Sequence, residues 1–578
     1  MTTAQGWLQV GLFCALLTAL TPLLGAYMHK VFRGDAILAS SAGRVERGFY
    51  RILRVDPGEE QDWKAYARSV LVVSLGSWLL LYLILRTQGI HPFNPAGFSS
   101  GPADLSFNTA SSFVSNTNWQ FYAGETTLSN FSQMAGLAVQ NFVSAAVGIA
   151  VAIAVIRGFS NRSLSTLGCF WVDFTRALLY VLLPIAFALA LLFVSQGVVQ
   201  SLAPARAFTS LEGAEQAIAL GPVASQEAIK LLGTNGGGFF NVNSAMPFEN
   251  PSGLVNVVQM LAILAIPAGL TATFGRMVGN RRQGWMIYGA MFAFFAAAVA
   301  IVYAAEAHGS PAQHLAGIAG GNLEGKETRF GMPGTSLFAV VTTVASCGAV
   351  NAAMESLTGI GGAIPMANMM TGEVIFGGVG SGLYSMLMFV ILAVFVAGLM
   401  VGRTPELLGK KIGAREVKLT MIGTLAAPLL ALVATAAAIA SGHGLRSIHN
   451  GGPQGFSETL YAYVSQANNN GSAFAGYTGF VQPNAPGNAG AFGLTFADLL
   501  GGGAMLAGRF LPLVAVLAIA GALAGRTAHP DGPGTLRTDT ATFGALTIGT
   551  ILLVALLTFV PALLLGPVVQ GLTDRMFR

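Results

Sequence analysis

The stretch LLGTNGGGFFN, residues 231–241, places three consecutive glycines inside a strongly apolar chain. Taken alone, it would be explained by an exposed turn, because glycine and asparagine are common turn residues. The composition of the whole chain argues against that explanation. Of its 578 residues 53% are hydrophobic and only 10% are charged, whereas a soluble domain has about 25% charged residues. The sequence predicts an all-α integral membrane protein, so the glycine run must be explained within a bilayer.

Ten apolar stretches are long enough to cross a bilayer as helices, which takes about 20 residues. They cover approximately 7–28, 66–86, 132–157, 167–195, 252–278, 284–306, 381–402, 419–441, 503–525 and 542–567. The first stretch lacks the basic start and the small-residue cleavage site of a secretion signal, so we expect a retained span. Because no long linker divides the chain, residues 1–578 are expected to form a single integral membrane domain.

Basic residues are distributed unevenly between the loops. Every second loop is rich in them, and these five loops hold 20 of the 30 lysines and arginines. The positive-inside rule makes these loops cytoplasmic and places both termini outside. The net charge of +5 therefore indicates basic loops at the lipid surface rather than binding of nucleic acid.

The outward-facing connections each contain a short segment that cannot cross the bilayer, at about 106–118, 224–236, 335–348 and 457–471. Segments of this length are typical of re-entrant structure. Their ends have the sequences FVSNTNWQF (113–121), LLGTNGGGF (231–239), TVASCGAVN (343–351) and SQANNNGSAF (465–474). The tips NTN, TNG, SCG and NNG recur at near-constant spacing, which indicates an internal repeat.

Four repeats, each a helix, a re-entrant loop and a helix, can surround one axis and contribute one tip each to a constriction. The expected repeats are 66–157, 167–278, 284–402 and 419–525, with extra spans at 7–28 and 542–567. Non-helical backbone is tolerated at membrane depth only where protein or a water-filled cavity satisfies its polar groups. Rings of carbonyls can replace the hydration shell of a monovalent cation. Since the tips contain no Asp or Glu, the pattern favours potassium over calcium or magnesium.

Four longer motifs resemble one known family, the potassium-binding A subunits of bacterial Kdp potassium-transporting ATPases. They are NTASSFVSNTNWQFYAGETTLSNFSQMAGLAVQNF (108–142), LLGTNGGGFFNVNSAMPFENP (231–251), MMTGEVIFGGVGSGLY (369–384) and GRTPELLGKKI (402–412). The resemblance runs through all ten spans. It implies the fold of the superfamily of potassium transporters, with four pseudo-symmetric helix–pore loop–helix repeats and one extra helix at each end.

The family resemblance also implies a function in the bacterial inner membrane. Such a subunit selects K+ from outside and passes it to a P-type ATPase B subunit, in a complex with a C subunit and a small F subunit. This chain has neither a phosphate-binding GxxxxGK[ST] loop nor an Asp-Lys-Thr-Gly phosphorylation motif. ATP use is therefore expected only in the partner subunit, and no organic cofactor is expected here.

The resemblance further implies a selectivity filter that acts largely through backbone carbonyls. Its residues would be Asn116, Thr117, Asn118, Thr234, Asn235, Gly236, Ser346, Cys347, Gly348, Asn469, Asn470 and Gly471. Asn118 stands where the other tips have glycine, so the first quadrant is expected to be the less symmetrical one. Cys347 is interpreted as a small packing residue. Gln120 is expected to support the first loop rather than to coordinate the ion.

Ionisable residues within spans are functional hypotheses by default. Glu373 lies in the glycine-rich TGEVIFGGVGSG, where the resemblance places an intramembrane loop; it either holds a gate there or pairs at an interface. Arg509 either limits ion occupancy or pairs with a loop carboxylate. Arg403 either extends to the membrane edge or contacts the ATPase subunit. Asp173 and Arg176, three residues apart, are interpreted as a pair within one helix.

Two other functions remain to be separated from the pump subunit. A stand-alone potassium channel or an ion-coupled symporter could have the same architecture. A membrane enzyme is disfavoured, because the seven histidines lie in loops or at span ends without an HExxH motif.

Overall fold

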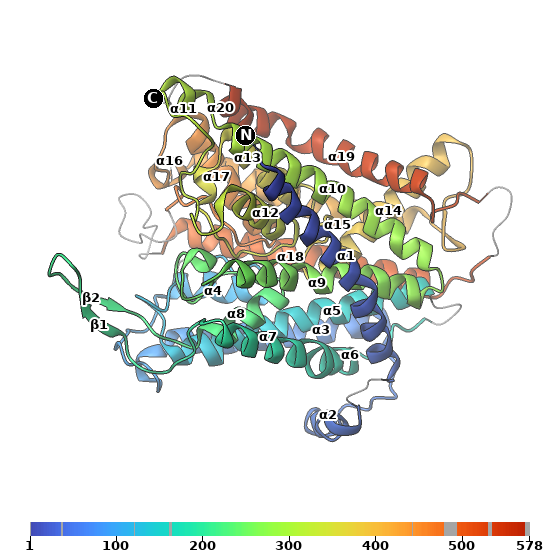
Figure 1. Cartoon of the computed structure of the whole chain (residues 1–578). Helices are drawn as coiled ribbons and strands as arrows, with labels where there is room; N and C mark the ends of the chain where they lie inside the picture. The colour runs from blue at the N-terminus through green and yellow to red at the C-terminus, as the bar shows by residue number, and fades with distance from the viewer. Residues whose placement is uncertain are drawn as a thin grey trace.

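The computed structural model describes residues 2–35, 39–120, 122–160, 165–441, 443–478, 494–529 and 535–572. Within these residues, ten helices are long and apolar enough to cross a membrane, as predicted (Figure 1). They are α1 (Ala4–Arg33), α3 (Trp63–Arg86), η2 with α5 (Ser132–Ala138 and Val139–Ser160), α6–η3–α7 (Phe170–Arg176, Ala177–Leu182, Leu183–Ser195), α9 (Gly253–Met277), α10 (Arg281–His308), α14 (Ser381–Met400), α15 (Ala414–Ala440), α18 (Phe496–Ala524) and α19–η7–α20 (Ala541–Leu563, Leu564–Val568, Val569–Leu572).

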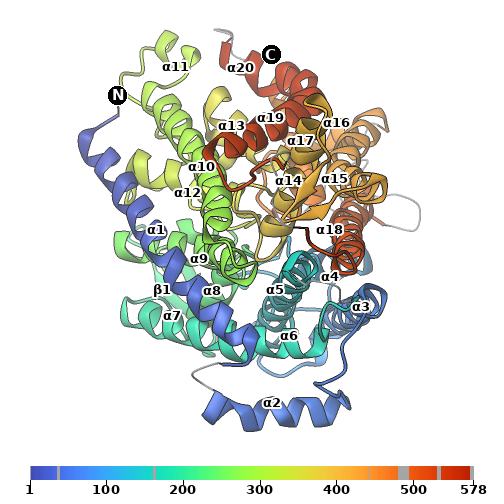
Figure 2. The same cartoon turned by 90° about the vertical axis from the view of Figure 1, so that its right-hand side faces the viewer.

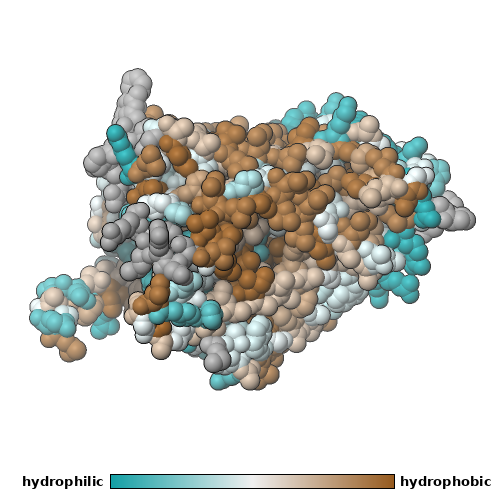
Figure 3. Space-filling model, turned by 90° about the horizontal axis from the view of Figure 1, so that it is seen from above, coloured by the Kyte–Doolittle hydropathy of each residue, from teal (hydrophilic) through white to brown (hydrophobic). Residues whose placement is uncertain are grey.

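The spans form one bundle with an apolar belt. Figure 3 shows hydrophobic side chains across the middle of the molecule and hydrophilic ones gathered toward its ends. On α1, Leu8, Leu12 and Leu16 lie on the outside, 73%, 59% and 42% exposed. The central helix α5 is instead buried along nearly its whole length. Leucines spaced along one side of a peripheral helix are typical of contact with lipid.

Four shorter helices lie between the spans, one in each repeat. They are α4 (Ala103–Val114), α8 (Val223–Leu232), α12 (Gly331–Val344) and α17 (Gly452–Ala467). Each lies between two spans and ends at one of the four tips, so each repeat is a span, a pore helix with its loop, and a second span. The expected fold class, including an extra helix at each end, is confirmed.

The third repeat departs from this plan. Its second span is preceded by the half-helix α13 (Gly359–Met370), and a non-helical segment, 371–380, joins this half-helix to α14. Glu373 and Phe376 adopt left-handed φ values of 61° and 62° in this segment. The glycine-rich motif thus forms an intramembrane loop rather than a continuous helix.

The remaining elements are small and lie at the ends or edges of the bundle. The hairpin β1–β2 (Arg206–Thr209, Glu215–Ile218) protrudes from one end of the bundle (Figure 1). A second, shorter hairpin is β3–β4 (Glu406–Leu407, Lys410–Lys411). The short helices are α2 (Ala39–Leu53), η1 (Gln88–Ile90), η4 (Asn243–Ala245), α11 (Pro311–Leu315), η5 (Met354–Ser356) and α16 (His443–Ser447).

One expected ion pair is wrong. Asp173 binds Arg157 of α5, with Nη2 to Oδ1 at 2.8 Å, and Arg176 binds Glu46 of α2, with Nε to Oε1 at 3.1 Å. Tyr66 also donates to Asp173, at 3.1 Å. A pair confined to one helix would have left the largely buried Arg157 without a carboxylate, and an unpaired buried charge is strongly destabilising.

Candidate functional site: a ring of four loop tips

The four pore helices end in the same backbone turn. In each repeat, the N–H of the middle tip residue donates to the carbonyl of the residue five positions earlier. The bonds are Thr117 to Ser112 at 2.8 Å, Asn235 to Lys230 at 2.8 Å, Cys347 to Thr342 at 3.0 Å and Asn470 to Ser465 at 2.8 Å. The sequence repeat is therefore matched by a repeat of local structure.

The first residue of each tip has a left-handed backbone. The φ values are 65° at Asn116, 52° at Thr234, 48° at Ser346 and 53° at Asn469. Such values are uncommon for residues other than glycine and more so for a β-branched residue such as Thr234. They cost about 1–3 kcal/mol each and concentrate at functional sites. Fourfold recurrence at equivalent positions indicates a shared function of the loops.

The tips contact one another in a closed ring. Asn118 Nδ2 donates to the Gly236 carbonyl at 2.9 Å, which joins the first and second loops. The third loop contacts the second through Gly348 N–H and the Asn235 carbonyl at 3.3 Å. The fourth contacts both the third and the first: Asn470 Nδ2 donates to the Thr342 carbonyl at 3.1 Å, and Asn469 Nδ2 donates to Thr117 Oγ1 at 3.0 Å. The structure thus brings all twelve predicted filter residues into one ring.

Two tip glycines are required by close approach as well as by φ. A Cβ atom on Gly236 (φ 84°) would lie 2.0 Å from Gly348 N, and one on Gly471 (φ 95°) would lie 1.8 Å from the Thr117 carbonyl oxygen. No side chain fits at either position. The first glycine of the run, Gly236, therefore allows the second loop to contact the third.

The departure from symmetry lies in the third quadrant, not in the first as expected. Asn118 adopts a φ of 54°, close to the values of Gly236 and Gly471 at the same position. Gly348 is absent from the left-handed residues, and the Thr342 hydroxyl donates to the Cys347 carbonyl. Cys347 itself is fully buried, in keeping with its interpretation as a packing residue.

The electrostatics of the ring favour a cation. The C-terminal ends of four helices, which carry partial negative charge, meet at the tips. No tip residue is acidic or basic. A ring of neutral oxygens beside four helix C-termini can attract a monovalent cation without binding a divalent one tightly.

A buried charged cluster lies beside the second tip, at the C-terminal end of its pore helix α8; it was not predicted from the sequence. Lys230 Nζ lies 2.6 Å from Glu227 and 3.3 Å from Glu249, and it also donates to the Gly237 carbonyl. All three charged side chains are at most 1% exposed. The signal was available, since a lysine in an apolar pore helix is costly unless paired.

Side chains from α5 and from the loops themselves brace the ring. Asn118 Nδ2 donates to Asn141 Oδ1 at 2.9 Å, and Ser144 Oγ donates to Asn116 Oδ1 at 2.8 Å. Gln120 Nε2 donates to the Tyr122 carbonyl at 2.8 Å and to the Gly238 carbonyl at 3.1 Å. These contacts favour the interpretation of Gln120 as a support of the loop.

A wide cavity of about 460 Å³ opens outward from the ring. Its lining includes Trp119, Gln120, Asn243, Gly348, Gly471 and Tyr477. Because two tip glycines form part of its floor, a hydrated ion in this vestibule would reach the ring directly.

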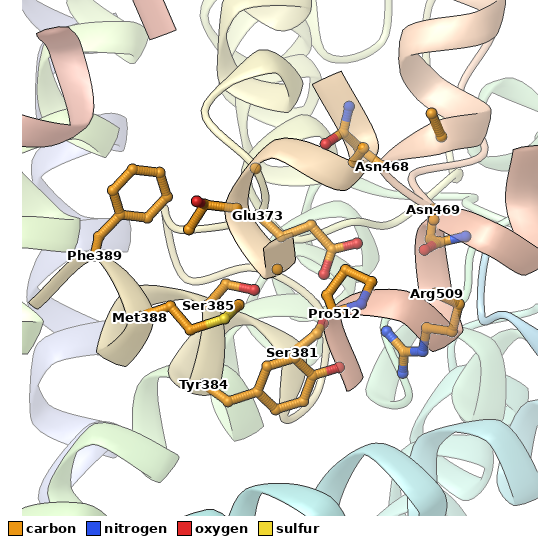
Figure 4. Close-up of a pocket in the computed structure, with 16 residues that line it drawn as sticks. Glu373, Ser381, Tyr384, Ser385, Met388, Phe389, Asn468, Asn469, Arg509 and Pro512 are labelled. Atoms are coloured by element: carbon orange, nitrogen blue, oxygen red, sulfur yellow. The ribbon is translucent and has the colours of Figure 1, made fainter. Parts of the chain in front are cut away.

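The intramembrane loop 371–380 covers the opposite side of the ring. Val379 N–H donates to Thr234 Oγ1 at 2.8 Å, and Gly377 N–H donates to the Val344 carbonyl at 2.8 Å. A small cavity of about 30 Å³ separates part of this loop from α18, lined by Glu373, Arg509 and others (Figure 4). The way inward from the ring is therefore narrow and lined by two opposite charges.

Glu373 and Arg509 both line this cavity, and Figure 4 shows both reaching into it with Pro512 between them. Arg509 lies halfway along α18, deeper than the outer third expected from the sequence. It is 4% exposed, and it forms no ion pair within 4 Å with any residue that the structure describes. An unpaired guanidinium next to a cation pathway opposes ion occupancy there.

Arg403 lies apart from the ring. It follows the C-terminal end of α14, where its N–H donates to the Gly398 carbonyl and its side chain is exposed. Both of its interpretations, extension to the membrane edge and contact with a partner, suit this position.

Comparison with known proteins places the chain among potassium transporters. Residues 11–572 match the family model described as potassium-transporting ATPase A subunit (KdpA). The potassium-transporting ATPase potassium-binding subunit of Mesorhizobium japonicum is 55% identical over 99% of this chain and 98% of its own length. The subunit of the same name from Brucella anthropi is 56% identical over the same shares. The crystal structure of the potassium transporter TrkH from Vibrio parahaemolyticus has a similar fold, with a TM-score of 0.52, 14% identity and coverage of 78% of this chain and 84% of that one.

Proposed function

This chain belongs to the family of potassium-transporting ATPase A subunits, and we propose that it selects K+ at the ring of four tips and delivers it to an ATP-hydrolysing partner. The single observation that carries this proposal is the closed ring, in which the first residue of every tip is left-handed. The twelve tip residues would bind K+, mainly through backbone carbonyls. The repeat boundaries proposed from the sequence place one tip in each repeat.

The direction of transport follows from the two sides of the ring. We place the vestibule outside and the basic loops in the cytoplasm, with both termini outside, in the bacterial inner membrane. K+ would lose its hydration shell on passing from the vestibule into the ring. The loop 371–380 and the side chains of Glu373 and Arg509, which line the narrow cavity beyond it, would then prevent free passage into the cytoplasm, so the ion leaves only when the partner accepts it.

The partner is proposed to be the P-type ATPase B subunit, in a complex with the C and F subunits. The chain itself would hydrolyse no ATP. Arg403, exposed on the cytoplasmic side, is a candidate contact with that partner.

Potassium-dependent ATP hydrolysis by the purified complex tests the proposal. We expect K+ to stimulate hydrolysis and Na+, Rb+ and Cs+ to do so far less at equal concentration. A complex that hydrolyses ATP without regard to K+, and through which K+ flux simply follows its gradient, would favour a channel or an ion-coupled symporter instead.

A further inference from the structure

Helix α2 lies beside the bundle at its cytoplasmic end. In Figure 2, where the spans are viewed roughly end-on, α2 is seen along its length, below α6 and outside the outline of the bundle. Its 15 residues are fewer than the roughly 20 that a span requires. The helix therefore runs in the plane of the membrane instead of crossing it.

One face of α2 fixes the helix to α6 and η3. Glu46 pairs with Arg176 at 3.1 Å and accepts a hydrogen bond from the Tyr180 hydroxyl at 2.7 Å. Tyr50 donates to Glu46 at 2.6 Å and is only 7% exposed. Because these contacts reach the fourth span directly, the depth of α2 in the membrane is set by that span.

A belt of tryptophans indicates what this depth is. Trp63, Trp171 and Trp285 lie at the cytoplasmic starts of α3, α6 and α10. Tryptophan at such positions is typical of the level of the lipid headgroups. Trp171 packs on the same apolar cluster that Tyr50 of α2 enters. The docked helix thus lies at headgroup level.

A second face of α2 is apolar and uncovered. Val45, Phe49 and Ile52 are spaced by four and three residues, which places them on one side of a helix. They are 49%, 43% and 79% exposed. Exposure of these apolar side chains to water would be unfavourable, whereas at the boundary between headgroups and acyl chains they would be buried.

The third face is basic. Arg44, Arg47 and Arg51 follow one another at helical spacing, and all three are exposed. None of them forms an ion pair with a residue of the described ranges. Basic residues beside an anionic leaflet are attracted to it, so this face complements lipid phosphates.

We propose that α2 is an in-plane anchor that binds the cytoplasmic leaflet. Val45, Phe49 and Ile52 insert at the boundary between headgroups and acyl chains, and the three arginines bind the phosphates of anionic lipids. This goes beyond potassium selection and does not depend on it. The docking face would transmit the position of the leaflet to the fourth span through Glu46 and Arg176.

Spin labels on the intact complex in lipid vesicles test the insertion. Labels are placed on Phe49→Cys and, as a matched control on the same helix, on Arg47→Cys, in a background without other reactive thiols. We expect the label at 49 to collide with oxygen in preference to an aqueous nickel chelate, with a ratio several-fold above that at 47. Preferential collision with the chelate at 49, or shielding from both reagents, overturns the proposal; the second result would mean that a protein partner covers this face.

The choice of lipid tests the arginines. Adding phosphatidylglycerol to phosphatidylcholine vesicles is expected to deepen the label at 49, and the combined variant Arg44→Gln, Arg47→Gln, Arg51→Gln should abolish this response. The control is Arg282→Gln, which replaces an exposed arginine at the start of α10; in this variant phosphatidylglycerol should still move the label at 49 deeper. A response that survives the triple substitution overturns the anionic part of the proposal. Potassium-stimulated ATPase activity reports separately on the integrity of the complex.

Discussion

The backbone N–H of Gly348 donates a hydrogen bond to the carbonyl oxygen of Asn235, 3.3 Å away, across the boundary between two pore loops. In the same loop the Thr342 hydroxyl donates to the Cys347 carbonyl. The third tip is thus held by its neighbour on one side and by its own pore helix on the other. In the other three quadrants the equivalent pore-helix residues bond to different atoms of their loops: Ser112 to the Trp119 carbonyl, Lys230 to the Gly237 carbonyl and Ser465 to the Gly471 N–H.

Replacing Thr342 with Val tests this restraint. Valine keeps the shape and removes the hydroxyl, so the Cys347 carbonyl is left free to turn. We expect the complex to discriminate less between K+ and Rb+ in its ATPase stimulation, with its thermal stability little changed. Thr342→Ser keeps the donor and serves as the control; equal losses in both variants would mean that the hydrogen bond is not responsible.

Replacing Gly236 with Ala should weaken potassium affinity. The added Cβ meets Gly348 N at 2.0 Å and sits on a backbone with φ 84°. Strain of about 1–3 kcal/mol corresponds to a loss of roughly 5- to 150-fold in apparent affinity. The measurement is the K+ concentration that half-maximally stimulates ATP hydrolysis.

Gly503→Ala is the control for that substitution, because a Cβ there has no neighbour within 4 Å. It should leave the affinity as it is. An unchanged affinity and selectivity in Gly236→Ala would remove the tips from ion binding.

Replacing Glu373 with Gln should impair coupling more than binding. The carboxylate and Arg509 line the same small cavity beyond the ring, and the amide would remove the carboxylate from this cavity while the buried guanidinium remains. We expect a several-fold loss of ATP-driven K+ uptake with a smaller change in the half-stimulating K+ concentration. Glu324→Gln, at an exposed position, should have neither effect, and wild-type uptake in Glu373→Gln would exclude the residue from the mechanism.

Replacing Asp498 with Asn should stabilise the protein. Both carboxylate oxygens of Asp498 are buried and have no hydrogen-bond partner within 3.5 Å among the described residues, and Asp104 adds a like charge nearby. Since an unsatisfied buried group costs about 1–3 kcal/mol, the amide should raise the midpoint of thermal unfolding by a few degrees. Asp104→Asn should stabilise less, because Asp104 accepts hydrogen bonds from Thr495 N–H and Leu105 N–H. A lower midpoint for Asp498→Asn would show that the carboxylate has a ligand.

Composition and repetition predicted the fold from the sequence, because ten long apolar stretches and four matched tips are local patterns. The gathering of those tips followed from the repeat. The broken symmetry did not follow, since it depends on contacts between loops: Gly348 departs because of Asn235, while Asn118 takes the glycine conformation. The partners of Arg157 and Arg176 were missed for the same reason, because they lie on other helices.

The charged cluster beside the second tip could have been found. Lys230 stands next to the glycine run, and a search for partners would have found Glu227 three residues away on the same helix. Its second partner, Glu249, comes from the loop beyond the ring. Sequence spacing indicates neighbours on one helix but not those brought in by a returning loop.

Because the four quarters of the constriction are encoded in one polypeptide, each quarter can change alone during evolution. In a channel of four identical subunits, by contrast, every substitution appears four times around the opening. Here the third tip begins with serine and cysteine, whereas the other three tips begin with asparagine or threonine at these two positions. Ion preference in such a protein can therefore drift in small steps, one side of the opening at a time.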